Sequence, residues 1–295
     1  MGGSLLFAAL LTFASPALAQ NCGTPAPEGP AVGPQYDTTH VYTSAADYDR
    51  FMQSLVATFG GRLTPKNTAN VAPVPSSTWT QLALTPAGSI SAFAFQTPVP
   101  WPLGAERTGY LVKDLDQAVA AARAAGASVL VAPFRDPIGR DAVIQWPGGV
   151  NMQLYVHDKA PCYAPLATVP ENRVYVAPEA IDAFVRGFTA FAKGRLIGDE
   201  ARAPGEEVGQ PGARVRRVRI ESGFGKLVAY ATNGQLPFPY GREMTGYEVP
   251  DLDATLAKAQ AAGAELLVGP VTLADRRSAM LRFPGGYIAE LHAPR

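Results

Sequence analysis

The chain has 295 residues, in which 25 Lys and Arg balance 25 Asp and Glu, and 47% of the residues are hydrophobic. This composition excludes a basic nucleic-acid binder, an acidic tail protein and a disordered chain, because disorder requires high net charge and few apolar residues. At roughly 150 residues per domain, the length predicts about two domains. Domains of that size bury enough surface to fold without metals or disulfides.

The first residues resemble an export signal. The apolar run 5–14 is too short for a membrane-spanning helix, which needs about 20 residues, and Ala17-Leu18-Ala19 forms a small-x-small cleavage site. We therefore predict a signal peptide over 1–19 and a periplasmic or secreted mature protein. The segment before the run lacks Lys and Arg, so a frayed apolar tail on a cytoplasmic protein stays open as an alternative. No other segment approaches transmembrane length, and we expect no membrane insertion.

The two cysteines are Cys22, in a Pro/Gly-rich lead-in over 20–35, and Cys162, in a Pro-containing connecting stretch. Export places both in an oxidising compartment. We predict that they form a disulfide, which closes a loop of about 140 residues and stabilises the fold by up to about 5 kcal/mol on the chain-entropy view. Two unpaired thiols are the alternative.

The chain repeats itself, which predicts two tandem domains. The first copies are Thr108–Asp116, Ala124–Ala127 and Trp146–Gly149, and they return at constant spacing as Thr245–Asp253, Ala261–Ala264 and Phe283–Gly286. We place the first domain at 36–157, the linker at 158–170 and the second domain at 171–295.

Each domain also reads as two cycles of one smaller unit. The first cycle predicts a strand over 40–43, a helix over 46–58, and strands near 78–84 and 89–95. The second predicts a strand over 109–112, a helix over 117–125 with an acidic cap at Asp114–Asp116, and a Gly126 stop. Three strands follow, at 129–131, 142–146 and 151–156. The order is β-α-β-β-β, and the second domain repeats it.

These motifs resemble the vicinal oxygen chelate superfamily, which includes glyoxalase I, extradiol dioxygenases, and bleomycin and fosfomycin resistance proteins. The resemblance covers nearly all of the mature chain. It rests on the strand followed by Asp-Leu-Asp, the Ala-Ala-Gly-Ala helix end and the Pro-Gly-Gly turn. It implies an α+β fold of two tandem domains, each made of paired βαβββ units with a curved mixed sheet. Function is not implied, because this fold hosts isomerases, oxygenases, transferases and binding proteins.

Many members of the superfamily hold a divalent metal with ligands from the first, fourth, fifth and eighth strands of a domain. Here His40 and Gln153 match two of those positions in the first domain, and Glu290 matches one in the second. Arg107 and Arg173 occupy ligand positions, although arginine cannot ligate a cation. His292 points to the same strand face as Glu290. We take His40, Gln153, Glu290 and His292 as candidate ligands of a divalent metal, with a metal-free protein as the alternative.

Strand alternation predicts what else lines the two concave faces. The first face would carry His40, Tyr42, Arg107, Gln153 and Tyr155, and the second Arg173, Tyr175, Glu248, Glu290 and His292. Arg107 and His40 would bind an anionic oxygen of a ligand. Glu248 and Glu290 would act as general bases, or would form a structural ion pair with Arg173.

Four other residues are placed from sequence context alone. Trp101 and Phe238 lie in rigid Pro-rich loops, where they would either cover the cavities and stack on a ligand or plug the core. His157 is expected at the surface, and Asp141 in a solvated hairpin tip.

We therefore expect an exported glyoxalase-like enzyme that acts on a small oxygenated organic molecule by stabilising an enolate or oxygen, as an isomerase, lyase or hydrolase. Glu248, Glu290 and Arg107 are its candidate catalytic residues. The alternative is a non-catalytic small-molecule binding protein of the bleomycin-resistance type. A standard lactoylglutathione lyase is disfavoured because the ligand set is incomplete. The expected partner is a small molecule, and the chain is expected to be a monomer or homodimer.

Overall fold

The computed structural model describes residues 26–104 and 108–295. The predicted signal peptide, Cys22 and Arg107 lie outside these residues, so export, the Cys22–Cys162 disulfide and the role of Arg107 stay predictions. Among the described residues no cysteine is free. In the same part of the chain, no helix has the length and apolar character needed to cross a membrane.

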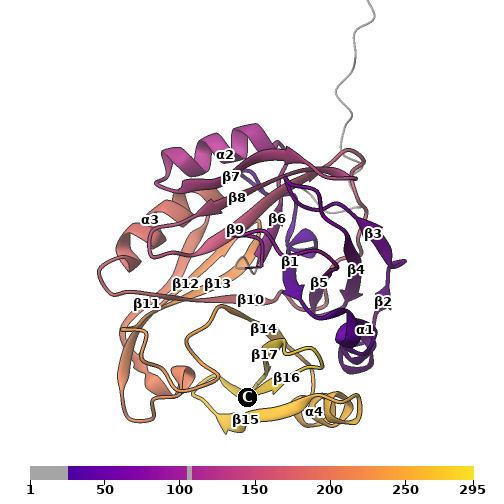
Figure 1. The fold of residues 1–295 in the computed structure, drawn as a ribbon. Helices are drawn as coiled ribbons and strands as arrows, with labels where there is room; N and C mark the ends of the chain where they lie inside the picture. The colour runs from indigo at the N-terminus through magenta and orange to yellow at the C-terminus, as the bar shows by residue number, and fades with distance from the viewer. Residues whose placement is uncertain (1–25, 105–107) are drawn as a thin grey trace, which may run out of the picture.

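Two mixed sheets form the framework (Figure 1). The first contains β1 (Thr38–Tyr42), β2 (Arg62–Leu63), β3 (Asn67–Ala69), β4 (Thr78–Thr85), β5 (Gly88–Phe95), β6 (Thr108–Leu111), β7 (Ser128–Arg135), β8 (Gly139–Gln145) and β9 (Asn151–His157). The second contains β10 (Glu171–Val176), β11 (Arg195–Pro204), β12 (Arg214–Ser222), β13 (Gly225–Ala231), β14 (Met244–Glu248), β15 (Glu265–Thr272), β16 (Arg276–Arg282) and β17 (Ile288–Pro294). The helices are α1 (Ala45–Phe59), α2 (Leu115–Ala124), α3 (Ile181–Ala192) and α4 (Leu252–Ala261), with short 3-10 turns η1 (Pro34–Tyr36) and η2 (Gly205–Val208).

Each sheet joins two βαβββ units through their first strands. The order is β2-β4-β5-β1-β6-β9-β8-β7 in the first sheet and β11-β12-β13-β10-β14-β17-β16-β15 in the second. The central pairs β1 with β6 and β10 with β14 are antiparallel, whereas each first strand is parallel to the last strand of its own unit. The predicted fold of paired units in two curved mixed sheets is confirmed.

Three helices, α1, α2 and α4, begin where the sequence offers a side-chain cap, whereas α3 begins after Ala180 without one. The side chains of Ser44, Asp114 and Asp251 each accept a hydrogen bond from a backbone N–H of the first turn. The second helix starts at Leu115, earlier than expected, because Asp114 alone is its cap. The first strand likewise starts at Thr38, two residues before the predicted boundary.

Both halves of the chain share the two largest hydrophobic cores of the described residues. One core joins Tyr110 and Trp146 of the first half to Phe184 and Phe188 of the second, beside the packed helices α2 and α3. The other joins the first unit to the last, beside α1 and α4 (Figure 1). The length suggested two self-sufficient domains, but these cores depend on both halves.

The shared cores decide which face of each sheet is available for a site. The hydroxyls of Thr39 and Thr245 are hydrogen-bonded at 2.8 Å between the two sheets. Because side chains alternate along a strand, His40 points to the opposite, outward face of the first sheet. Gly246 likewise faces outward on the second sheet, where a Cβ would lie 2.6 Å from Glu290 Oε2. The two concave faces therefore point away from each other.

Candidate functional site

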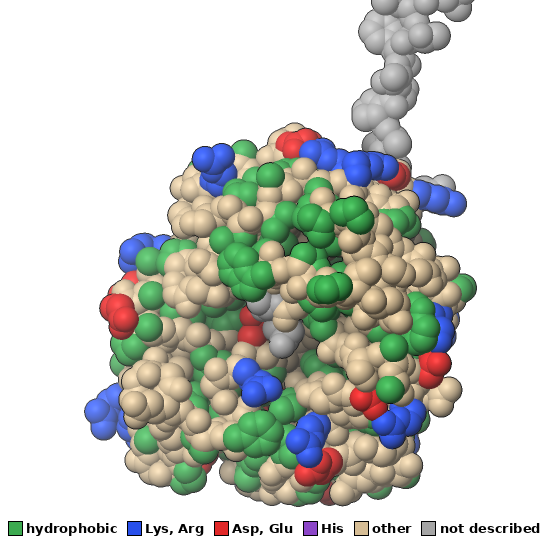
Figure 2. All heavy atoms as spheres, viewed as in Figure 1, with side chains coloured by type: hydrophobic (Ala, Val, Ile, Leu, Met, Phe, Trp, Pro, Cys, Tyr) green, Lys and Arg blue, Asp and Glu red, His purple; other side chains and the backbone are tan. Residues whose placement is uncertain are grey.

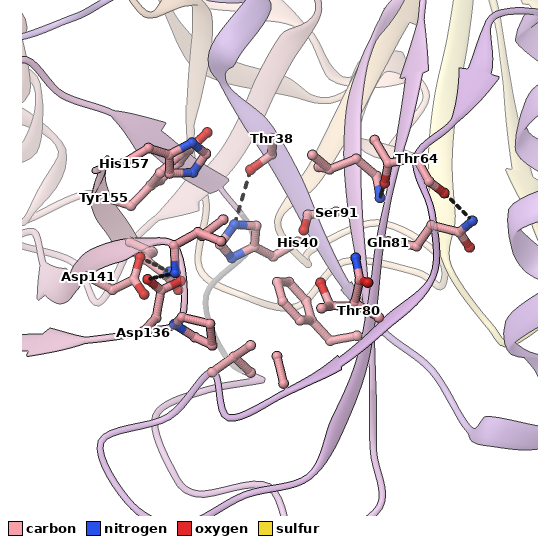
Figure 3. Close-up of a pocket in the computed structure, with 18 of the residues that line it drawn as sticks. Thr38, His40, Thr64, Thr80, Gln81, Ser91, Asp136, Asp141, Tyr155 and His157 are labelled. Atoms are coloured by element: carbon pink, nitrogen blue, oxygen red, sulfur yellow. Dashed lines mark hydrogen bonds between the residues drawn. The ribbon is translucent and has the colours of Figure 1, made fainter. Parts of the chain in front are cut away.

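A cavity of about 490 Å³ lies on the concave face of the first sheet (Figure 3). One wall is aromatic: the Tyr42 ring stacks on Phe93 at 5.3 Å and on Phe95 at 6.1 Å between ring centroids. Polar side chains line the rest, among them Thr38, His40, Asn67, Thr80, Gln81, Ser91, Asp136, Asp141, Gln153 and His157. The sequence placed His40, Tyr42, Gln153 and Tyr155 together here, and the structure brings these four to one cavity.

His40 lies on β1 at the base of this cavity and is 3% exposed. Its Nε2 lies 3.1 Å from Thr38 Oγ1 (Figure 3), and its ring contacts the Phe93 ring edge-on at 5.3 Å. Gly109 makes room for this arrangement, since a Cβ at that position would lie 2.3 Å from His40 Nε2. The Thr-Gly-Tyr repeat in the sequence thus marks a point where a side chain crosses over a neighbouring strand.

Gln153 is oriented by an aspartate that the sequence placed elsewhere. Gln153 Nε2 donates to Asp141 Oδ1 at 2.9 Å. A carboxylate only accepts hydrogen bonds, so Asp141 engages the amide nitrogen and leaves the amide oxygen of Gln153 as an acceptor. Asp141 was expected in a solvated turn, but β8 starts at Gly139, and alternation turns Asp141 into the cavity and Arg140 outward to Asp116.

His157 also faces the cavity, which corrects the expectation of a surface residue. It is the last residue of β9, and its ring lies 5.2 Å from the Tyr155 ring. Burial lowers the pKa of His157, while the charges of Asp136 and Asp158 act in the opposite direction. The signal for this placement was the spacing of two from Tyr155 and four from Gln153, which puts all three on one strand face.

The concave face of the second sheet holds a buried ion cluster around Arg173. Arg173 is 2% exposed, its Nε lies 3.1 Å from Glu171 Oε1, and its Nη2 lies 3.8 Å from Glu290 Oε1. Arg276 Nη1 lies 3.3 Å from the same Glu171 oxygen. His292 Nδ1 lies 2.7 Å from Glu290 Oε2, and Ser278 Oγ donates to Glu290 Oε1.

The carboxylates in this cluster are paired with the arginines around them. Burial by itself raises the pKa of Glu171, but the positive charges of Arg173 and Arg276 outweigh it and lower that pKa to about 2. Burial likewise opposes ionisation of Glu290, and Arg173 and His292 together lower the pKa of Glu290. Both carboxylates are therefore held ionised and paired, which is the structural ion pair left open by the sequence.

More buried side chains flank the cluster on the same face. The Tyr230 hydroxyl donates to Glu207 Oε2 at 2.7 Å, and Glu207 is ion-paired with Arg217. The Arg173 guanidinium carbon lies 5.9 Å from the centre of the Tyr230 ring. Polar and aromatic side chains thus occupy the region that corresponds to the cavity of the first sheet.

Besides Arg173, Glu290 and His292, three further predicted site residues lie outside the first cavity. Glu248, at the end of β14, lies 3.5 Å from Lys226 Nζ. Trp101 is 74% exposed, and Phe238 is 60% exposed with the Arg242 guanidinium carbon 5.7 Å from its ring centre. Neither aromatic residue is among the residues that line the cavity. Their role as covers over a ligand stays a prediction.

No protein-family model matches the chain, and no curated protein matches it either. Several solved structures, in contrast, match the chain. A mutant of 4-hydroxymandelate synthase from Streptomyces coelicolor is 11% identical over 91% of this chain and 93% of its own, with a TM-score of 0.59. The 2,3-dioxygenase LapB from Pseudomonas sp. KL28 is 11% identical over 90% and 93%, with a TM-score of 0.51.

A third match is a xylose isomerase-like TIM barrel/4-hydroxyphenylpyruvate dioxygenase fusion protein. It is 15% identical over 91% of this chain, with a TM-score of 0.55, and the match spans 50% of the fusion protein. The chain has the vicinal oxygen chelate fold. At these identities the likeness concerns the fold, and the chemistry has to be argued from the residues of this chain.

The residues do not fit the chelated metal that this fold often carries. His40 and Gln153 lie on one concave face and Glu290 and His292 on the other, so the predicted four-residue site is not assembled. On the second face the Arg173 guanidinium stands between Glu171 and Glu290, where a metal would need those carboxylates. Within 26–104 and 108–295, no group of three or more His, Cys, Asp or Glu side chains could hold a metal ion.

Proposed function

We propose that the protein binds a small oxygenated organic molecule in the cavity of the first sheet and acts on it by proton transfer. The observation that carries this proposal is the cavity itself, which Gln153 lines and in which an aromatic wall adjoins His40. Its volume of about 490 Å³ lies within the range of roughly 300–1,000 Å³ typical of small-molecule sites.

His40 is the side chain best placed for the chemistry. A neutral imidazole accepts a proton from a carbon next to a carbonyl group, and the resulting imidazolium stabilises the enolate oxygen until the proton returns. Ser91 lies beside His40 in the parallel pairing of β1 with β5, and Gln153 offers a hydrogen-bond acceptor. This proposal moves the chemistry from Glu248 and Glu290, the residues first considered, to the first half of the chain.

Binding without chemistry is the second candidate. It is favoured by the hydrogen bonds that the polar lining residues make to one another, His40 to Thr38 and Gln153 to Asp141. Such pairs leave fewer groups to act on a ligand, while the stacked rings of Tyr42, Phe93 and Phe95 supply a surface for a flat molecule.

One experiment separates the two candidates. A panel of small α-keto and α-hydroxy carbonyl compounds is incubated with the protein in D₂O, and deuterium uptake next to the carbonyl group is followed by NMR. Uptake that His40→Gln abolishes supports the enzyme, and binding without uptake supports the binding protein. Phe93→Ala should weaken binding, and Phe238→Ala, which removes an exposed aromatic outside the cavity, is the matched control. Unchanged binding in Phe93→Ala would contradict this location.

We also propose that the mature protein is exported. The apolar run 5–14 and the cleavage site at Ala17-Leu18-Ala19 support this proposal. The intact mass of protein recovered from the periplasm or medium tests it, since cleavage near Ala19 predicts a mature chain that starts at Gln20. Alkylation with and without reductant on the same sample tests the disulfide between Cys22 and Cys162.

A further inference from the structure

The amide group of Gln153 has a fixed orientation in the wall of the first cavity. On the paired strands β8 and β9, Val143 lies opposite Gln153 and Asp141 lies opposite Tyr155, so Asp141 and Gln153 are diagonal neighbours on one face. Gln153 Nε2 donates to Asp141 Oδ1 at 2.9 Å. Asp141 is 5% exposed, and a buried carboxylate needs hydrogen-bond donors from the protein.

The opposite orientation of this amide is unfavourable. Turning the Gln153 amide by half a turn would place its oxygen against Asp141 Oδ1, and two acceptors cannot form a hydrogen bond. The loss of one hydrogen bond corresponds to roughly fivefold or more in population. Within 26–104 and 108–295, no group donates a hydrogen bond to Gln153 Oε1. Because Gln153 lines the cavity, this oxygen is the end of the amide that a ligand meets.

The neighbouring side chains favour the same kind of ligand group. Figure 3 shows Asp136 and Asp141 on one side of the cavity and Thr80 and Ser91 on the other. An ionised carboxylate, like an amide oxygen, only accepts hydrogen bonds. Among the described residues that line the cavity there is no Lys or Arg. A ligand oxygen that carries a proton therefore finds acceptors on the side of Asp141.

We propose that Gln153 selects a ligand with a hydroxyl group, and that Asp141 is the positioning residue that keeps the amide oxygen turned toward the ligand. This inference rests on the proposed function and names its substrate class, a hydroxylated carbonyl compound whose hydroxyl donates to Gln153 Oε1. The stacked rings of Tyr42, Phe93 and Phe95 accommodate a flat group of the same molecule.

Two compounds of similar shape test the selection. 2-Hydroxyacetophenone has an aromatic ring, a carbonyl group and a hydroxyl, and 2-methoxyacetophenone has a methyl group in place of the hydroxyl proton. We expect the wild-type protein to bind the hydroxyl compound roughly tenfold more tightly, as one hydrogen bond provides. Dissociation constants from a binding titration give this ratio, and a ratio near one would overturn the proposal.

Variants separate the hydrogen bond from the size of the methyl group. Gln153→Leu removes the acceptor, so the ratio of the two dissociation constants should fall roughly tenfold, while any effect of the methyl group's size remains. Gln145→Leu is the matched control and should keep the wild-type ratio. Gln145 is a half-buried glutamine on β8 that donates to Asn151 Oδ1 and does not line the cavity. An unchanged ratio in Gln153→Leu would overturn the selection by Gln153.

Asp141→Asn tests the positioning. Asparagine both donates and accepts, so it allows either orientation of the Gln153 amide, and the ratio should fall toward that of Gln153→Leu. General damage to the cavity would weaken both compounds alike and leave the ratio unchanged. Without ligand, ¹⁵N NMR of the Gln153 side chain should show one Nε2 proton protected from exchange with water, and Asp141→Ala should remove that protection. A full ratio in Asp141→Asn, or equal exchange in Asp141→Ala and the wild type, would overturn the role of Asp141.

Deuterium uptake next to the carbonyl group of 2-hydroxyacetophenone is followed on the same samples. Selective binding without uptake would reject the proposed proton transfer and keep the selection. Uptake without a preference for the hydroxyl compound would reject the selection alone. Failure of 2-hydroxyacetophenone to bind would also reject the selection, whatever other carbonyl compounds show.

Discussion

Replacing Arg173 with methionine tests whether the second concave face is a structural ion cluster. Methionine has a similar reach and no charge. In Arg173→Met, the buried Glu290 loses its ion pair with Arg173 and keeps only its contact with His292. Glu171 keeps its ion pair with Arg276. Removing one partner of a buried pair typically costs about 3–5 kcal/mol, because the other charge is left uncompensated. The pKa of Glu171, lowered from 4.5 to about 2, corresponds to a stabilisation on the order of 3 kcal/mol and gives the same scale.

Urea unfolding at pH 7 measures this loss, and we expect a decrease of roughly 3–5 kcal/mol in the free energy of unfolding. The matched control is Arg277→Met. Arg277 follows Arg276 on β16 and forms an exposed ion pair with Asp253, so its loss should change the urea midpoint of unfolding little. Adding Glu290→Gln to Arg173→Met should recover much of the loss, since it removes the stranded charge. The loss should also shrink toward pH 4, because burial without Arg173 raises the pKa of Glu290 and the carboxyl becomes protonated. The ion-cluster account would be refuted if Arg173→Met lowered the free energy of unfolding no more than Arg277→Met does. It would also be refuted if adding Glu290→Gln recovered none of the loss.

Three further predictions concern other parts of the fold. Both Asp37 oxygens are buried without a hydrogen-bond partner among the described residues, and burial raises the pKa of Asp37. Its stabilising contribution is therefore complete below the unfolded pKa near 4 and is lost as the pH rises toward the folded pKa. Between those two pKa values, the free energy of unfolding of Asp37→Asn relative to the wild type should rise by up to about 1.4 kcal/mol per pH unit. A difference in urea unfolding that does not change with pH would contradict this. Gly109→Ala should displace His40 and weaken ligand binding, unlike Gly198→Ala, where a Cβ meets nothing within 4 Å; equal effects in a binding titration would count against the cavity geometry. Residues 26–157 expressed alone should lack a cooperative thermal transition, because their cores need the second half; a sharp transition by circular dichroism would show the opposite.

The sequence was sufficient to predict the fold because local signals and repeats agreed. The Asp114 and Asp251 caps, the Ala-Ala-Gly-Ala helix ends and the Pro-Gly-Gly turns recur at constant spacing, and the strands between them alternate. Strand alternation also grouped His40, Tyr42, Gln153 and Tyr155 correctly. These inferences need only the order of elements along the chain and the two-residue period of a strand.

The rest of the site depended on contacts that no local pattern encodes. Asp141 and His157 were misplaced because the strands β8 and β9 extend further than their apolar residues indicate. Arg173 was recognised as unfit for a metal, but its partners Glu171 and Arg276 were not identified from the sequence, and Arg276 comes from a distant hairpin. His40 and Glu290 are separated because the shared cores bury the inner face of each sheet and leave the two concave faces pointing apart. This arrangement appears only when the whole chain is folded.

The most direct test of the account is to map where small molecules bind. Amide and methyl NMR shifts of the mature protein are recorded with a library of hydroxylated and carbonyl-bearing aromatic fragments. We expect the changes to centre on the cavity around His40, Phe93 and Gln153 (Figure 3), and to leave the surroundings of Arg173 and Glu290 unchanged. Figure 2 shows that charged and hydrophobic side chains are interspersed over the face viewed there. Fragments that bind at the Arg173 cluster and not in the first cavity would contradict the central claim.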